Sequence, residues 1–235
     1  MIIHYIRIHS SAKSVQIMEF NILILFLLII VGVSIKAFND AAFMERLMFI
    51  PYLVKRDKQF YRIGSHMLIH GDSTHLIFNS LALYLLGDVF LNAFTGVYVG
   101  VDGGLIEYYG LLMGQVHFGL IFILGGLFAG IIPYLRNHDN PSYRSLGASG
   151  AVSAVIFAAI LWNPTMEIGF LFIPIGIPAY IFGPLYLLFE FIMDKRGNSG
   201  IAHDAHIGGA IFGVLYVLIL NIDKGKEFVN LFFGG

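Results

Sequence analysis

The stretch AHIGGAIFGVLYVLIL, Ala205–Leu220, contains no charged side chain and is almost wholly apolar after its first residues. About 20 such residues are enough to cross a bilayer as a helix. Gly209 and Gly213 form a G-x-x-x-G pattern, which allows a second membrane helix to approach closely. His206 lies on the same helical face as both glycines, at positions i, i+3 and i+7. The stretch therefore predicts a closely packed membrane helix with an imidazole near its start.

The composition of the whole chain also indicates a membrane protein. Of its 235 residues, 57% are hydrophobic and only 12% are charged, and the mean hydropathy is +0.79. Soluble domains carry about 25% charged residues. A net charge of −1 argues against nucleic acid as a partner. The absence of cysteine excludes disulfides, thiolate nucleophiles and cysteine-based metal sites.

We expect an all-α membrane protein with one bundle of six transmembrane helices. The predicted spans are roughly 20–36, 75–94, 116–135, 147–162, 168–192 and 204–222. Residues 1–19 then form a short N-terminal segment, 20–222 the membrane domain and 223–235 a C-terminal tail. The fifth span is broken by Pro174, Pro178 and Pro184, which marks a segment able to bend. The glycine-rich segment 95–114 fits either a loop or an interfacial helix.

The second, fourth and sixth spans enter the membrane from the same face, and each has polar or small residues at its entrance. These are His75 and Asn79 in HGDSTHLIFN (70–79), GASG (147–150), and His206. Three clusters that are far apart in the sequence are therefore expected at one depth, on one side of the membrane.

Ser149 has a structural and a catalytic interpretation. A serine in a membrane helix most often hydrogen-bonds to a carbonyl one turn earlier. Gly147 and Gly150, however, allow a tight turn that exposes the hydroxyl. The backbone N–H groups at a helix start, including that of Ala148, lack intrahelical acceptors and are suited to an oxyanion.

His206 gains significance from the packing that the small residues predict. Gly150, Ala154 and Ala158 form a small-residue stripe on the fourth span, which matches the glycines of the sixth. Close packing of these helices would bring His206 to Ser149, and a serine beside a histidine base is an activated nucleophile. Asp204 faces elsewhere, so we expect a Ser–His dyad without an orienting carboxylate.

His75 and Asn79 lie one turn apart on one helix face. Their side chains are either helix-to-helix hydrogen-bonding groups or donors to an oxyanion. Sequence reasoning leaves both roles open at this point.

These motifs together resemble the rhomboid family of intramembrane serine proteases. HGDSTHLIFN resembles the family's H-x-x-x-N element, GASG its G-x-S-G motif and AHIGGAIFG its A-H-x-x-G-x-x-x-G helix. YRIGSHMLIH (61–70) resembles the segment that leads from the first loop. The motifs occur in family order on the expected helices.

The resemblance implies a serine endopeptidase that cleaves transmembrane segments of membrane proteins and needs no cofactor. It implies that Ser149 is the nucleophile and His206 the general base and acid. It also implies that the oxyanion is stabilised by His75 and Asn79. The backbone N–H groups of Ala148 and Ser149, in the motif that begins at Gly147, would add to this stabilisation. Gly150, Gly209 and Gly213 would serve helix packing, and the broken fifth span would be a lateral gate.

Two features depart from simple expectation. Many family members have an aromatic residue four positions after the serine, where this chain has Ser153, so what holds the imidazole is left open. The resemblance also implies a bacterial inner membrane location, with cytoplasmic termini and the active site toward the extracytoplasmic side. That orientation puts ten of the 14 Lys and Arg residues outside, against the positive-inside rule.

Two other interpretations compete with the protease. One is a metal-binding membrane protein that uses His66, His70 and His75, because His66 and His70 have the i, i+4 spacing of helical metal ligands. The other is a catalytically silent rhomboid-like protein that binds membrane helices. The partners expected for the protease are transmembrane protein substrates and the lipid bilayer.

Overall fold

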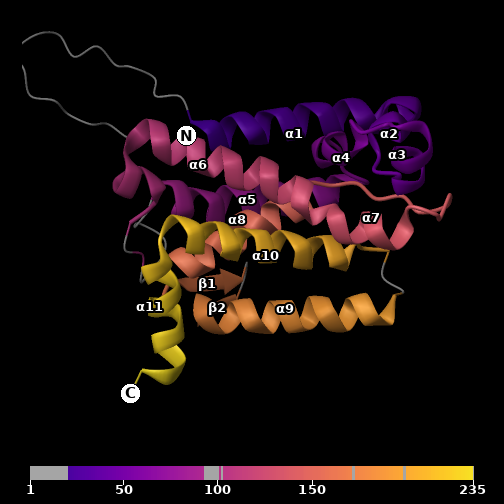
Figure 1. Ribbon diagram of the computed structural model, residues 1–235. Helices are drawn as coiled ribbons and strands as arrows, with labels where there is room; N and C mark the ends of the chain where they lie inside the picture. Colours follow the sequence, from indigo (N-terminus) through magenta and orange to yellow (C-terminus); the bar gives the residue numbers. More distant parts are fainter. Residues whose placement is uncertain (1–20, 93–100, 102, 171–172, 198–199, 235) are drawn as a thin grey trace, which may run out of the picture.

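The computed structural model describes residues 21–92, 101, 103–170, 173–197 and 200–234, and its long helices lie side by side in one bundle (Figure 1). These helices are α1 (Ile22–Phe38), α5 (Ser73–Asn92), α6 (Leu105–Ala129), α8 (Ser149–Trp162), α9 (Ala179–Arg196) and α10 (His203–Leu220). Of the 14 residues of α8, 12 are buried, so α8 is the central helix around which the others pack.

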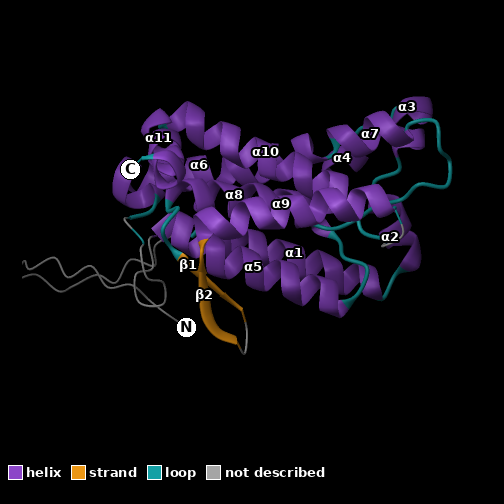
Figure 2. Ribbon diagram, turned by 90° about the horizontal axis from the view of Figure 1, so that it is seen from below, coloured by secondary structure: helices purple, strands orange, loops and turns teal. Residues whose placement is uncertain are grey.

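Short elements close the two ends of the bundle. One end carries α2 (Ala41–Leu47), α3 (Pro51–Asp57), α4 (Arg62–Ser65), the 3-10 helix η1 (His66–Leu68) and α7 (Ile131–Asn137). The amphipathic helix α11 (Ile222–Phe233) lies at the opposite end, where α1 also begins (Figures 1 and 2). Arg62 is buried among the short helices and donates to the carbonyls of Glu45 (2.8 Å) and Met48 (2.7 Å), which satisfies its charge in place of water.

Side chains at the helix starts explain where two of the long helices begin. Asn21 Oδ1 accepts from the N–H groups of Leu23 (2.9 Å) and Ile24 (3.3 Å) and so caps α1. Asp72 Oδ1 accepts from the N–H of His75 at 2.8 Å and caps α5 in the same way.

Among the described residues, three helical stretches are long and apolar enough to cross a membrane. They are Ser73–Asn92, Leu105–Asn137 and His203–Leu220, whereas Ile22–Phe38 and Ser149–Trp162 are apolar but shorter. The chain is therefore a mostly helical membrane protein, with helices at or near each of the six predicted positions. α6 begins at Leu105 but is kinked at Gly110 (φ 77°, ψ 167°), where two helical segments meet, and the segment after Gly110 contains the start of the third predicted span.

The all-α prediction is wrong for the segment before α9. Strands β1 (Glu167–Phe170) and β2 (Ile173–Pro178) pair in antiparallel fashion, in a region predicted to belong to the fifth span. Pro174 and Pro178 have no N–H to donate within a helix, and an extended edge strand tolerates this loss. The helical part of the fifth span therefore begins only at Ala179.

Two further expectations concern the ends and the glycine-rich segment. Residues 1–19, 93–100 and 102 lie outside the described residues, so the N-terminal segment and the first part of 95–114 are not tested. The rest of 95–114, from Leu105 onward, is helical. The predicted C-terminal tail is helical as well, since α11 extends to Phe233.

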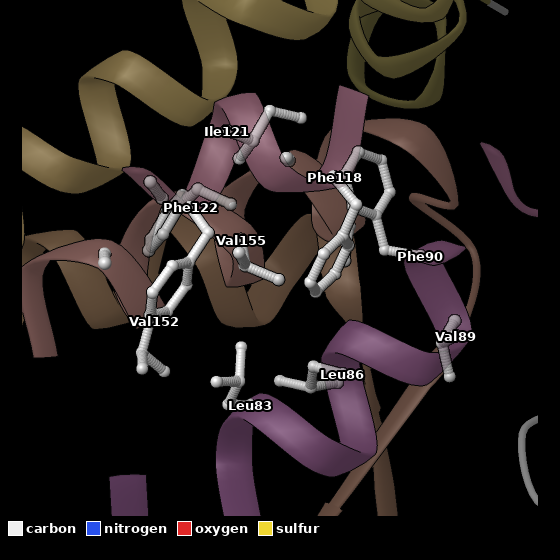
Figure 3. Close-up of a cluster of buried hydrophobic side chains, with 14 of the residues drawn as sticks. Leu83, Leu86, Val89, Phe90, Phe118, Ile121, Phe122, Val152 and Val155 are labelled. Carbon is white, nitrogen blue, oxygen red and sulfur yellow. The ribbon is translucent and has the colours of Figure 1, made fainter. Parts of the chain in front are cut away.

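The hydrophobic core joins α5, α6 and α8 (Figure 3). Its labelled side chains point toward one another from the three helices: Leu83, Leu86, Val89, Phe90, Phe118, Ile121, Phe122, Val152 and Val155. On the other side of α8 the contact with α10 involves backbone instead of large side chains. A Cβ atom at Gly209 would overlap the carbonyl oxygen of Gly150, and one at Gly213 would overlap that of Ala154.

We predict that Gly209→Ala lowers the free energy of unfolding of the detergent-solubilised protein by about 1–3 kcal/mol or more, and with it the melting temperature, because overpacking forces two backbones apart. Gly32→Ala is the matched control, since a Cβ there meets nothing within 4 Å. The fluorescence of Trp162, the single tryptophan, buried at the end of α8, reports the transition. Equal melting temperatures for the two variants would contradict the close α8–α10 packing.

Candidate active site

The turn before α8 is held from both sides. Gly147 has φ +119°, a conformation that favours glycine, and its N–H donates to the carbonyl of His66 at 3.0 Å. A Cβ at Gly147 would lie 2.8 Å from Cε1 of His75, so the imidazole of His75 packs directly on this turn. Ser149 follows as the first residue of α8 and is partly accessible. No side chain caps the start of α8.

His70 fixes the next residue of the turn. Its Nε2 accepts the N–H of Ala148 at 3.4 Å, and its Nδ1 lies 2.9 Å from Ser34 Oγ on α1. Burial lowers the pKa of His70 to about 4, so the ring is neutral and free to accept a hydrogen bond. In this structure the N–H of Ala148 is directed to His70, and its role toward an oxyanion stays a prediction.

His75 and Asn79 lie on α5 beside this turn. The rings of His75 and His70 meet edge-on, with centroids 4.9 Å apart. The Asn79 amide donates to the carbonyl of His75 at 3.1 Å, which leaves its second N–H available. The structure thus brings His75 to the Ser149 turn, and it places Asn79 one helical turn further along α5.

His206 and the Ser149 region meet across the α8–α10 contact. Ser153, one turn after Ser149, donates its hydroxyl to the carbonyl of His206 at 2.9 Å. The position of a Cβ at Gly150 lies 3.5 Å from the carbonyl oxygen of Ala205. The backbones that carry Ser149 and His206 are thus neighbours at the same level of the bundle, as the small-residue pattern predicted.

Sequence reasoning missed Glu190. This residue is on α9 and only 3% of its side chain is exposed, and its Oε1 lies 3.1 Å from Nδ1 of His206. The N–H direction of the ring is not aligned with this oxygen, so the contact is close without being a regular hydrogen bond. Oε2 of Glu190 lies 2.5 Å from Nδ1 of His203.

The expectation that no carboxylate reaches the histidine is therefore wrong. Glu190 is the single acidic residue in the predicted span 168–192. An ionisable residue inside a membrane helix is by itself a sign of a functional site, and this signal was available from the sequence. By contrast, Asp204 does face elsewhere, because it pairs with Nη1 of Arg136 at 3.3 Å.

The ligand atoms of His66, His70 and His75, the alternative metal site, do not converge on one point among the described residues. His66 packs beside Phe49 with ring centroids 5.2 Å apart, while His70 is engaged by Ser34 and Ala148. Within the described part of the chain, the potential metal ligands that converge within 4.8 Å are instead Glu190, His203 and His206.

Comparison with known proteins agrees with this arrangement. The family model described as "Rhomboid domain" matches residues 57–222, which include every motif above. The chain belongs to the rhomboid family. The resemblance inferred from the sequence is thereby confirmed.

Three curated rhomboid relatives show how far the similarity extends. RHOMBOID-like protein 12, mitochondrial, from Arabidopsis thaliana is 28% identical over 208 residues, or 78% of this chain and 54% of the relative. Presenilin-associated rhomboid-like protein, mitochondrial, from Homo sapiens is 30% identical over 112 residues, or 45% of this chain and 28% of the relative. The Rattus norvegicus protein of the same name gives 30% over 112 residues, 45% and 29%. The chain thus spans about half the length of the first relative and under a third of the other two.

We predict that the stability of this rhomboid protein falls as the pH drops from about 6.5 to about 4. The ordinary pKa of a histidine is 6.5, whereas burial lowers the pKa of His70 in the folded protein to about 4. Between these two values His70 is protonated in the unfolded chain but neutral in the folded protein, so a fall in pH favours unfolding. The loss is up to about 1.4 kcal/mol per pH unit for this group.

Melting temperatures measured between pH 7 and pH 4.5 test this prediction. His70→Gln removes the titrating group, so its stability should depend less steeply on pH than that of the wild type, whatever its absolute stability. Parallel curves for the two proteins would contradict the assignment.

Proposed function

We propose that this rhomboid protein is an intramembrane serine endopeptidase with Ser149 as nucleophile and His206 as general base and acid. The observation that carries the proposal is the α8–α10 contact, which holds the Ser149 turn and the His206 turn at one level. Adjacent backbones at this level support a side-chain contact between the serine and the histidine, which nucleophilic catalysis requires. The matched family domain contains both residues.

The reaction is a two-step acyl transfer. Ser149 Oγ attacks the carbonyl carbon of the scissile peptide bond while its proton moves to Nε2 of His206. The tetrahedral intermediate collapses as His206 protonates the leaving amine, and an acyl-enzyme on Ser149 remains. Water, deprotonated by His206, then hydrolyses the ester and restores the free serine.

Stabilisation of the oxyanion is assigned to His75, Asn79 and the backbone N–H of Ser149. His75 packs on the Gly147 turn, and Asn79 has an N–H beyond the one that it donates to His75. Removing one oxyanion donor costs about 10²–10³ in kcat in proteases where this has been measured. The neutral His70 accepts the N–H of Ala148 and so also holds this turn.

The substrates are transmembrane segments of membrane proteins, because the site lies inside a bundle that is itself embedded in lipid. In this proposal α1, α5, α6, α8, α9 and α10 are the six spans, and α9 with its preceding hairpin is the segment that admits substrate. Pro184 within α9 and exposed apolar side chains such as Leu185 and Leu188 on that helix support this role.

A fluorophosphonate probe tests the nucleophile. Detergent-solubilised wild type should be labelled, whereas Ser149→Ala should not be labelled and His206→Ala should react at least 100-fold more slowly. Ser80→Ala is a matched control, since Ser80 is also a serine of a membrane helix but its hydroxyl is buried on α5. If wild type is labelled no better than Ser149→Ala, the protein is a binding protein of the rhomboid fold and not a protease.

The proposed orientation puts the active-site end outside and the chain termini in the cytoplasm of a bacterial inner membrane; the curated relatives carry mitochondrial names. Because the chain has no cysteine, Lys58→Cys and Lys226→Cys give single labelling sites at opposite ends of the bundle. In intact bacterial cells an impermeant maleimide should label Lys58→Cys alone, and both after permeabilisation. Labelling of Lys226→Cys alone would reverse the orientation.

A further inference from the structure

Glu190 is a buried carboxylate at a place where burial is costly. Its side chain is 3% exposed, on a helix of a membrane domain. A carboxylate away from water must be paired and hydrogen-bonded to be tolerated. Its partners are Nδ1 of His203 at 2.5 Å, Nδ1 of His206 at 3.1 Å, and the hydroxyl of Tyr186 one turn earlier on α9. Three groups thus converge on one carboxylate, and one of them is the proposed catalytic base.

We propose that Glu190 is the positioning residue of His206 and makes the proposed dyad a Glu–His–Ser triad. This inference rests on the proposed function for its catalytic consequence. Glu190 Oε1 lies 3.1 Å from Nδ1, so the negative charge of the carboxylate favours the tautomer with the proton on Nδ1 even without an aligned hydrogen bond. Nε2 is then the unprotonated atom, which a base for Ser149 requires.

The proposed proton transfers need no further reactant. When Ser149 attacks, its proton moves to Nε2, and the proton on Nδ1 stays where it is. The ring becomes an imidazolium, and the carboxylate of Glu190 compensates the new positive charge where water cannot. When Nε2 passes its proton to the leaving amine, the ring returns to its starting state.

The neighbours of His206 act on different parts of the residue. Ser153 hydrogen-bonds the backbone carbonyl of His206 and so holds the helix in place. The ring of His203 lies edge-on to that of His206, with centroids 6.0 Å apart. Glu190 contacts the ring itself. His203 and Tyr186 in turn hold the carboxylate from two other directions, as groups behind a functional side chain commonly do.

The distances fit shared protons better than a metal ion. Nitrogen and oxygen ligands around a tetrahedral zinc lie about 2.0–2.2 Å from the metal and hence about 3.4 Å from one another. The 2.5 Å between Glu190 Oε2 and His203 Nδ1 is well below this spacing and is a direct hydrogen-bond contact. We therefore infer a hydrogen-bonded network and not a metal centre.

Two measurements on Glu190→Gln test the proposal. The first is the cleavage of a transmembrane substrate in proteoliposomes. We expect kcat to fall by about 10- to 100-fold with KM nearly unchanged, because a group behind the base affects the chemical step and not substrate binding. Glu190→Asp, which keeps the charge, should recover part of the loss, and Glu227→Gln on α11 is the control for the same change at a distant site.

The second measurement does not depend on activity. In protein with ¹⁵N-labelled histidine, assigned by comparison with His206→Ala, His206 should be the Nδ1–H tautomer in wild type. Glu190→Gln should move a substantial fraction to the Nε2–H form, since an amide holds the ring less strongly than a carboxylate.

The outcomes separate the two proposals. A tautomer change in a protein that neither cleaves nor reacts with the probe would support the positioning role and refute the protease. If the wild type is an active protease and Glu190→Gln has the same kcat and the same His206 tautomer, the positioning role alone is refuted. If Glu190→Gln does not fold, the Glu190→Asp tautomer decides, and a His206 ring without a preference for Nδ1–H in that variant would overturn the proposal.

Discussion

Helices α8 and α10 meet backbone to backbone, and the rest of the site depends on that distance. At Gly209 and Gly213 no side chain separates α10 from the carbonyls of Gly150 and Ala154. Between membrane helices there is little hydrophobic driving force, so close packing and interhelical hydrogen bonds such as Ser153 to His206 provide the association. Any larger residue at this contact would move His206 away from the Ser149 turn.

Specific hydrogen bonds from polar groups hold the turn before α8 in place. Gly147 donates to His66, Ala148 donates to His70, and His70 is held in turn by Ser34. These bonds tie the turn before α8 to the segments that precede α5 and to α1. The chain therefore positions Ser149 through several elements that are distant in sequence, and this rigid support is what a preorganised site requires.

Glu190 gives the histidine side of the site a comparable support. The sequence raised the question of what holds the His206 ring when Ser153 occupies the fourth position after the serine. In the structure Ser153 holds the backbone of α10, and a carboxylate from α9 reaches the ring. A helix that packs beside the site thus contributes to it, which links the placement of α9 to the chemistry proposed for His206.

The sequence alone determined the helical membrane class and the close packing of α8 on α10, because apolar length and small-residue spacing are local patterns, and its motifs indicated the family. It did not determine the hairpin at 167–178, where prolines permit several extended or bent conformations. It also did not assign the N–H of Ala148 to His70 or bring Glu190 to His206. Those contacts join residues 78 and 16 positions apart, on elements whose rotation about their own axes is set only when all helices pack together.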